Sequence, residues 1–270
     1  MNTFHDDDLT EFRAHGAQNL PDTTIQGYTE HDGASIWHAS FGSGEPVVLL
    51  HGGLGHSGNW GYQVPALVAH GFQAIVIDSR GHGRSTRDSR AYSYDLMASD
   101  VLAVMDSLRI ERASFVGWSD GAVIALTLAM KQPARVTRVF FFACNVDSGG
   151  AKDFQFTPVV RRCFDRNAED FARFSVTPDD FESLVSALGE MQRTQPEYRR
   201  DDLAKINVRV TSALSEQDEF IKLEHAKYIA AAIPGGTFVE LRDVSHFAPV
   251  QRPEQFNQAI LNSLSGATQV

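Results

Sequence analysis

A G-W-S-D-G segment at residues 117–121 carries a residue that could act as a nucleophile. It follows a short apolar run at 114–117 and precedes a helix-period pattern at 121–131. A serine on a tight turn from strand to helix needs glycine on both sides, because the backbone is strained and neighbouring elements come close. Its hydroxyl would then stand above the sheet, and the helix N-terminus would offer N–H groups to a developing oxyanion. We therefore predict Ser119 as a catalytic nucleophile.

A serine hydroxyl is a weak nucleophile, so it needs a general base and an acid that orients the base. His246 lies between a strand candidate at 237–241 and a helix that begins at Pro253. This places it on a loop at the carboxyl edge of the predicted sheet, where Ser119 is also expected. We predict His246 as the base.

Three acids compete for the orienting role. Asp218 follows the strand candidate at 208–211, Glu216 lies just before it, and Asp147 follows the preceding strand. Asp218 is the prediction, because in the order serine, acid, histidine the acid comes from the loop after this strand.

The H-G-G-L-G segment at 51–55 follows an apolar run at 47–50. Small residues allow the backbone to approach a substrate carbonyl, so the N–H of Gly53, or that of Leu54, could pair with the N–H of Asp120 as an oxyanion hole. His51 is expected to orient this loop. The loop at 78–85 is expected to support the nucleophile turn, and its His82 receives no catalytic role.

Short apolar runs alternate with longer helix-period patterns, which is typical of a parallel sheet covered by helices. A hairpin signal, Asp32-Gly33, separates two further strand candidates upstream. The strand candidates are residues 25–28, 35–39, 47–50, 74–77, 114–117, 136–143, 208–211 and 237–241. The helix candidates are residues 95–108, 121–131, 223–233 and 253–264.

The alternation stops between residues 146 and 202, where charged helix formers occur together with six phenylalanines. A helical insertion with one charged and one aromatic side can lie over a cleft. We expect residues 146–202 to form a helical cap on a core built from 21–145 and 203–270. Residues 1–20 are expected to be an acidic lead-in that could be disordered.

The 34 acidic residues against 24 Lys and Arg give a net charge of −10, which argues against nucleic-acid binding. The sequence has no apolar stretch long enough to predict membrane insertion, and its N-terminus lacks the basic and then apolar segments of a secretion signal. We therefore expect a cytoplasmic protein. The two cysteines, Cys144 and Cys163, have no metal-ligand spacing. We expect no metal site, and the oligomeric state stays open.

These motifs together resemble the α/β-hydrolase superfamily over residues 25 to 265. The resemblance implies a mostly parallel, eight-stranded α/β-hydrolase sheet flanked by helices, with a small helical cap inserted after the sixth strand. The segments at 117–121 and 143–145 also resemble the valacyclovir hydrolase group, also called biphenyl hydrolase-like proteins. That group hydrolyses α-amino acid esters, and the acid beside its nucleophile, here Asp120, is taken to bind the substrate ammonium. Ser215 and Ser245 depart from the pattern, where many relatives have glycine.

Asp120 has two interpretations. A carboxylate beside Ser119 could hold a cationic amine by a bond worth about 1.5 to 3 kcal/mol. An acid in the first turn of a helix is also stabilised by the helix dipole, by about 0.3 to 1 kcal/mol.

The sequence thus predicts a serine hydrolase that cleaves a small to medium carboxylic ester, α-amino acid esters included, through an acyl-enzyme. The partners are this small-molecule substrate and water, and the chemistry needs no cofactor. The alternatives are a lactonase or carbon–carbon bond hydrolase with the same three residues, and, in another class, a ligand sensor of the same fold without turnover. The residues expected to contact the substrate are Asp120, Leu54, Trp118, Asn145, Phe154 and Phe247.

Overall fold

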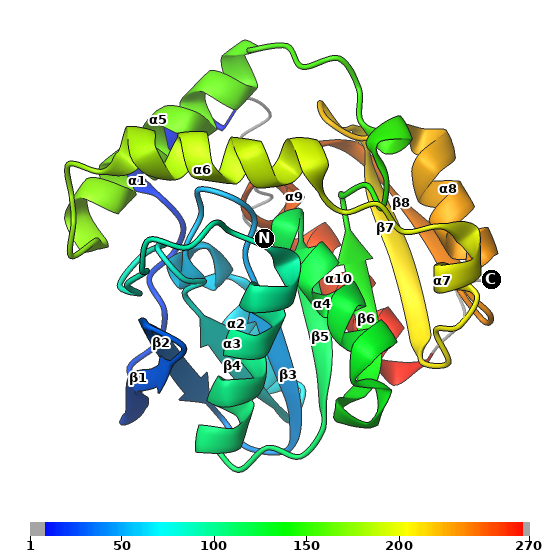
Figure 1. The fold of residues 1–270 in the computed structure, drawn as a ribbon, viewed down its shortest axis with the longest axis horizontal. Coiled ribbons are helices and arrows are strands. Elements are labelled where there is room, and N and C mark those ends of the chain that lie inside the picture. The colour runs from blue at the N-terminus through cyan, green and yellow to red at the C-terminus, as the bar shows by residue number, and fades with distance from the viewer. Residues whose placement is uncertain (1–8, 267–270) are drawn as a thin grey trace.

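The computed structural model describes residues 9–266, which form a sheet with helices on both faces (Figure 1). The eight strands are β1 (Ile25–His31), β2 (Ala34–Phe41), β3 (Glu45–Leu50), β4 (Phe72–Ile77), β5 (Ala113–Trp118), β6 (Val136–Phe142), β7 (Arg209–Gln217) and β8 (Thr237–Ser245). Their spatial order is β1-β2-β4-β3-β5-β6-β7-β8. β2 pairs antiparallel with β1 and β4, and the remaining pairs are parallel. The predicted mostly parallel eight-stranded sheet is confirmed.

Most helices occupy the connections between strands, whereas one precedes β1 and two follow β8. They are α1 (Thr10–His15), α2 (Gln63–Ala69), α3 (Tyr94–Ser107), α4 (Asp120–Lys131), α5 (Pro158–Phe174), α6 (Phe181–Thr194), α7 (Arg200–Leu203), α8 (Leu223–Ala232), α9 (Ala248–Gln251) and α10 (Pro253–Ser265). Short 3-10 turns are η1 (Ser57–Trp60), η2 (Pro133–Arg135) and η3 (Ser148–Gly150).

The predicted hairpin joins β1 and β2. Asp32 and Gly33 have φ of 46° and 79°, the left-handed conformation that a tight two-residue turn requires.

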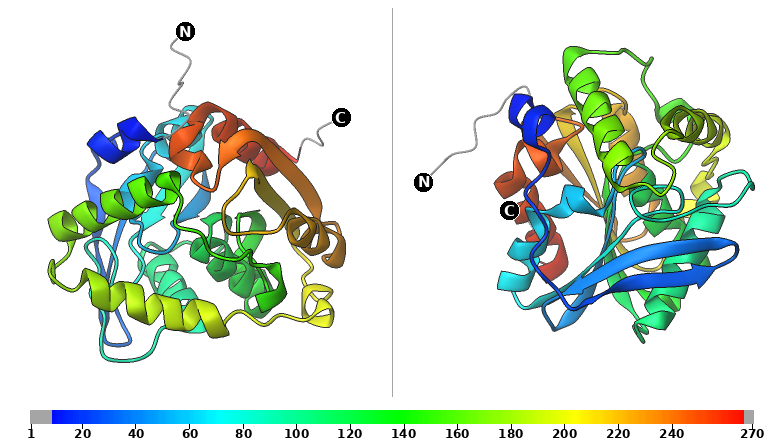
Figure 2. Two further views of the ribbon diagram at one scale, coloured as in Figure 1. Left: turned by 90° about the horizontal axis from the view of Figure 1, so that it is seen from above. Right: turned by 90° about the vertical axis from the view of Figure 1, so that its left-hand side faces the viewer.

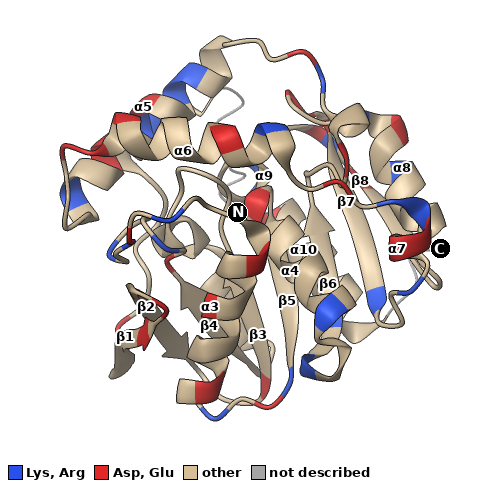
Figure 3. Cartoon of the chain, in the orientation of Figure 1, with Lys and Arg blue, Asp and Glu red and all other residues tan. Residues whose placement is uncertain are grey.

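The central strands are apolar on both faces because helices cover both. On β3, Val48 and Leu50 join the core shared with α3 and α4, whereas Val47 and Leu49 join the core shared with α2 and α10. Figure 3 shows charged residues mainly on helices and loops, with the strands almost free of them.

Helices α5 and α6 belong to the segment between β6 and β7, and they lie across the edge of the sheet at which β6 ends (Figure 1). We call residues 146–202 the inserted segment. Its helix α5 packs beside α1 (Figure 2). An ion pair joins the two helices, with Arg13 Nη2 2.8 Å from Glu169 Oε1.

The described part of the predicted lead-in contains the helix α1. Leu9 and Phe12 are buried against the core, and their burial fixes α1 in place. The lead-in is acidic, but its two buried apolar residues, Leu9 and Phe12, hold this segment against the core. Residues 1–8 of the predicted lead-in lie outside the described residues.

Candidate active site

Ser119 occupies the turn between β5 and α4, with φ 53° and ψ −122°. A Cβ at Gly117 would lie 2.4 Å from the Ala122 Cα, and one at Gly121 would lie 2.1 Å from the Leu50 carbonyl oxygen. Both contacts are impossible for a real side chain, so the chain needs glycine at these positions to hold Ser119 in its strained conformation.

His246 and Asp218 come together at the ends of the neighbouring strands β8 and β7. The distance from His246 Nδ1 to Asp218 Oδ2 is 2.8 Å, and both side chains are buried. The other carboxylate oxygen, Oδ1, accepts the backbone N–H groups of Phe220 and Ile221 at 2.9 and 2.8 Å. These bonds fix the carboxylate and leave His246 Nε2 as the ring atom directed away from it.

The two competing acids lie in other networks. Glu216 accepts the backbone N–H of Asp243, and Asp147 accepts that of Gly149 and lies 4.0 Å from His225 Nδ1. Within the described residues, neither is hydrogen-bonded to His246.

Ser119 donates its backbone N–H to the Phe142 carbonyl oxygen at 2.9 Å, and Cys144 follows two residues later on the loop after β6. No hydrogen bond joins Ser119 to His246 in the part of the chain that the structure describes. Such bonds are often long before substrate binds. Burial raises the pKa of the Cys144 thiol well above its ordinary value, with the Asp120 carboxylate adding to the effect, so this thiol stays protonated and a poor nucleophile.

The predicted oxyanion loop lies against the nucleophile. A Cβ at Gly52 would lie 3.1 Å from the Ser119 Cβ, and Leu54 takes φ 65° in the turn that follows. Across residues 9–266, the backbone N–H groups of Gly53 and Asp120 donate no hydrogen bond to another protein group. They are therefore available as donors to an oxygen on this side of Ser119.

The Asp120 side chain is buried and held by two neutral donors. The Tyr94 hydroxyl donates to Oδ1 at 2.7 Å, and the Gln192 amide, from α6, donates to Oδ2 at 2.9 Å. Burial raises the pKa of the Asp120 carboxyl, although these two bonds act in the opposite direction. Asp120 forms no ion pair with any described side chain, although the nearby His246, when charged, also lowers the pKa of this carboxyl.

The remaining predicted contact residues are distributed around the site. Trp118 and Phe247 pack against the His246 ring with centroid distances of 6.0 and 5.5 Å. Phe154 is 63% exposed and stacks on Phe220 rather than on His246 itself. Leu54 packs against the core beside α3 and α4, and the Asn145 amide donates to the Asp147 carbonyl oxygen at 2.8 Å.

Sequence reasoning missed four residues at this site. Tyr94 and Gln192 hold Asp120, Phe220 contacts His246, and Glu219 accepts the His246 backbone N–H at 2.9 Å. Glu219 and Phe220 could have been found by their position directly after Asp218. Tyr94 and Gln192 lie far from Asp120 along the chain, and no local pattern marks them.

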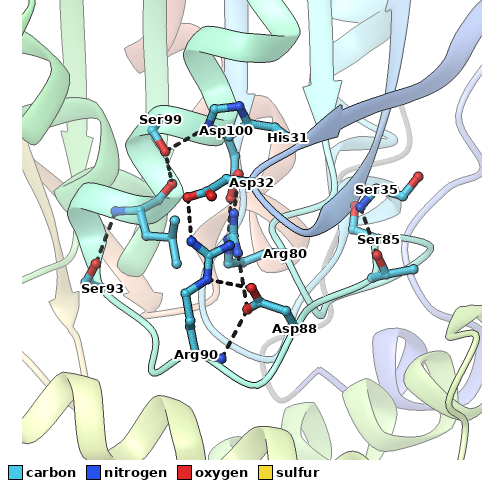
Figure 4. Close-up of polar contacts among 12 residues, drawn as sticks. His31, Asp32, Ser35, Arg80, Ser85, Asp88, Arg90, Ser93, Ser99 and Asp100 are labelled. Carbon is cyan, nitrogen blue, oxygen red and sulfur yellow. Dashed lines mark hydrogen bonds and ion pairs between the residues drawn. The ribbon is translucent and has the colours of Figure 1, made fainter.

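The loop after β4 is fixed by a hydrogen-bonded network that Figure 4 shows. Arg80 binds Asp100 on α3 through Nε and Nη2, both at 2.6 Å, and Arg90 Nη1 lies 2.6 Å from Asp32 Oδ2 in the hairpin. Ser79 donates its backbone N–H to His51 Nε2 at 3.0 Å. The loop therefore supports the oxyanion loop, rather than the nucleophile turn directly.

His51 and His82 are fully buried in this region, with ring centroids 5.1 Å apart. Burial lowers the pKa of His51 from 6.5 to about 4 and that of His82 to about 3. The unfolded chain binds protons here below pH 6.5 and the folded chain does not, so stability is lost as pH falls from 6.5. Each histidine accounts for about 2 kcal/mol at pH 5.

We expect His82→Asn to reduce this acid sensitivity, because an asparagine amide can still donate to the Arg80 carbonyl oxygen that His82 Nδ1 contacts at 2.9 Å. Urea unfolding at pH 7.5 and 5 should show a loss of unfolding free energy about 2 kcal/mol smaller than in the wild type. The exposed His70→Asn variant serves as the control and should keep the wild-type loss. An equal loss in all three proteins would contradict the assignment of neutral, buried histidines.

A cavity of about 340 Å³ lies elsewhere, between residues 15–23, β2 and the end of α5. None of Ser119, Asp218 and His246 lines it. Within residues 9–266 no three potential metal ligands among His, Cys, Asp and Glu cluster, and no helix has the length and hydropathy to cross a bilayer.

Comparison with known proteins agrees with this fold. The model of the alpha/beta hydrolase family matches residues 47–259, and the chain belongs to this family. It is a hydrolase enzyme, which acts on a small-molecule substrate with water.

Proteins similar to this chain differ in the substrates that their names describe. A Caulobacter sp. (strain K31) protein, provisionally named carbamate hydrolase RutD, is 29% identical over 261 residues, covering 85% of this chain and 94% of its own. The solved structure of Est816, described as an N-acyl homoserine lactone degrading enzyme, is 26% identical with a TM-score of 0.70, over 89% and 100% of the two chains. The meta-cleavage product hydrolase CumD of Pseudomonas fluorescens IP01 shares the fold at 20% identity and a TM-score of 0.76, over 90% and 99%.

Proposed function

We propose that this hydrolase cleaves carboxylic esters through an acyl-enzyme formed on Ser119. The observation that carries the proposal is the buried His246–Asp218 pair at the carboxyl edge of the sheet on which Ser119 is also displayed. The sequence-based choice of these residues supports the same chemistry, as do the N–H groups of Gly53 and Asp120, which donate to no other described group.

In the first half of the reaction, Ser119 Oγ attacks the ester carbonyl carbon and its proton passes to His246 Nε2. Asp218 stabilises the imidazolium, and the N–H groups of Gly53 and Asp120 stabilise the oxyanion. His246 then gives the proton to the leaving alcohol oxygen as the carbon–oxygen bond breaks.

In the second half, water gives a proton to His246 and attacks the acyl carbon. The acid leaves, and Ser119 regains its proton from His246. Apart from the ester and water, the groups that take part in these steps are side chains and N–H groups of this chain.

We also propose that the inserted segment acts as a cap over this site. Gln192 on α6 binds Asp120 directly beside Ser119, and Asp170 on α5 lies 3.3 Å from His56 Nε2, next to the oxyanion loop. Residues 21–145 and, up to the last described residue, 203–266 then form the core that the cap covers.

Product analysis on a short alkyl ester, a lactone and a vinylogous diketone distinguishes the proposed activity from its relatives' named activities. We expect kcat/KM to be highest for the ester. A lactonase is the second candidate, because a relative named for lactone degradation covers nearly the whole chain. Highest turnover of the lactone would replace the ester assignment by that one, with the same three residues.

An α-amino acid ester is the finer substrate that Asp120 favours, since this buried carboxylate has only neutral partners among the described residues. We expect an alanyl p-nitrophenyl ester to be preferred over the propionyl ester by about tenfold or more, beyond its greater intrinsic reactivity. The preference should be lost in Asp120→Asn. A propionyl preference in the wild type would instead limit Asp120 to holding Tyr94 and Gln192.

A further inference from the structure

The ring of His246 has an apolar neighbour on the side of the inserted segment. The Phe220 ring meets it with centroids 4.6 Å apart and planes at 74°, an edge-to-face contact. Phe154 then lies over Phe220, with centroids 6.0 Å apart and planes at 18°. Two stacked rings therefore lead outward from the proposed base.

These two rings are the end of a longer series. Each further ring contacts the next at centroid distances of 5.4 to 5.9 Å. We call this series the phenylalanine row; in order from His246 it comprises Phe220, Phe154, Phe156, Phe164, Phe181 and Phe171. At its far end, the buried Phe171 of α5 contacts Phe181 of α6.

Packing within the protein accounts for the buried ring at the far end of the row, but not for the exposed rings at its near end. Phe171 is buried in the core, whereas Phe154 is 63% exposed and Phe156 is 39% exposed. A single exposed ring is ordinary in a soluble protein. An exposed ring stacked on one that contacts the proposed base is available to a substrate.

The chemistry decides which part of the substrate lies there. His246 Nε2 must reach the leaving alcohol oxygen, so the alcohol portion lies beside the His246 ring and therefore beside Phe220. The carbonyl oxygen lies at the other side, toward Gly53 and Asp120. The nearby cations are already engaged: Lys152 donates to the Asp218 carbonyl oxygen at 2.6 Å, and the Arg161 guanidinium covers the Phe156 ring at 4.3 Å.

We propose that the natural substrate carries an uncharged aromatic alcohol portion, which packs on Phe154 and Phe220. This inference rests on the proposed ester hydrolysis through Ser119. Phe220 supplies the contact close to the reacting oxygen, and Phe154 supplies a second ring face toward solvent.

The test compares benzyl and methyl esters of the same short acid, because the two alcohols have similar acidity and differ in the ring. We expect wild-type kcat/KM to be about tenfold or more higher for the benzyl ester. Phe154→Ala should lower the benzyl-to-methyl ratio about five- to tenfold, and Phe154→Tyr, which keeps the ring, should retain the wild-type ratio.

Val176→Ala is the matched control, since Val176 is 61% exposed on the inserted segment and takes no part in the phenylalanine row. It should leave both rates unchanged. Hydrolysis of both esters with the same ratio in the wild type and Phe154→Ala would overturn this inference and leave the proposed function standing. Failure to hydrolyse any ester, lactones included, would overturn both.

Discussion

Replacing Ser119 by alanine is expected to lower ester kcat about 10⁴- to 10⁶-fold while the protein stays folded. The substitution removes only the hydroxyl, which carries the attacking oxygen, and keeps the Cβ of the residue in its strained turn. Steady-state kinetics with a p-nitrophenyl ester gives the rate, and circular dichroism with thermal unfolding checks the fold.

Ser186→Ala provides the control for serine removal, because Ser186 is exposed on α6. It should keep wild-type kinetics. Residual turnover in Ser119→Ala above about one per cent of wild type would contradict the nucleophile assignment.

Asp218→Asn should lower kcat about 10³- to 10⁴-fold, because the amide no longer stabilises the imidazolium and favours the wrong tautomer of His246. The backbone N–H groups of Phe220 and Ile221 still have an oxygen to bind at Oδ1, so the loop should keep its shape. The measurement is kcat across pH 5 to 9, with thermal unfolding alongside.

The competing acids supply matched controls for Asp218. Glu216→Gln removes a carboxylate that accepts the Asp243 N–H, and Asp147→Asn removes one that accepts the Gly149 N–H and lies 4.0 Å from His225 Nδ1. Neither carboxylate is hydrogen-bonded to His246 in the described chain, so each substitution should change kcat less than about threefold. A larger loss in either of these than in Asp218→Asn would reassign the acid.

The strands of the sheet could be predicted from the sequence because local residue patterns mark each of them. The central parallel strands are buried on both faces and read as apolar runs, and the turn at Asp32-Gly33 admits few other conformations. The position of Ser119 follows from its two glycines, since Leu50 and Ala122 leave no room for larger residues. These constraints act between a residue and its immediate surroundings.

Contacts made by long side chains across the fold could not be predicted in this way. Gln192 lies 72 residues after Asp120 in the chain. The position at which α6 crosses the sheet edge determines that this residue contacts Asp120. The N-terminal helix is a second case, because its docking depends on two buried apolar residues in an otherwise polar segment. The near end of the phenylalanine row is a third, since six phenylalanines in the inserted segment do not say which one meets Phe220.

The central claim is that an acyl group is transferred to Ser119, and mass spectrometry of the acylated protein tests it most directly. The protein is mixed with a slowly deacylated p-nitrophenyl ester, quenched in acid within the burst and digested. We expect one acyl group per chain, on the peptide that contains Ser119, and none in Ser119→Ala. No adduct during turnover, or an adduct on the neighbouring Cys144, would contradict the account.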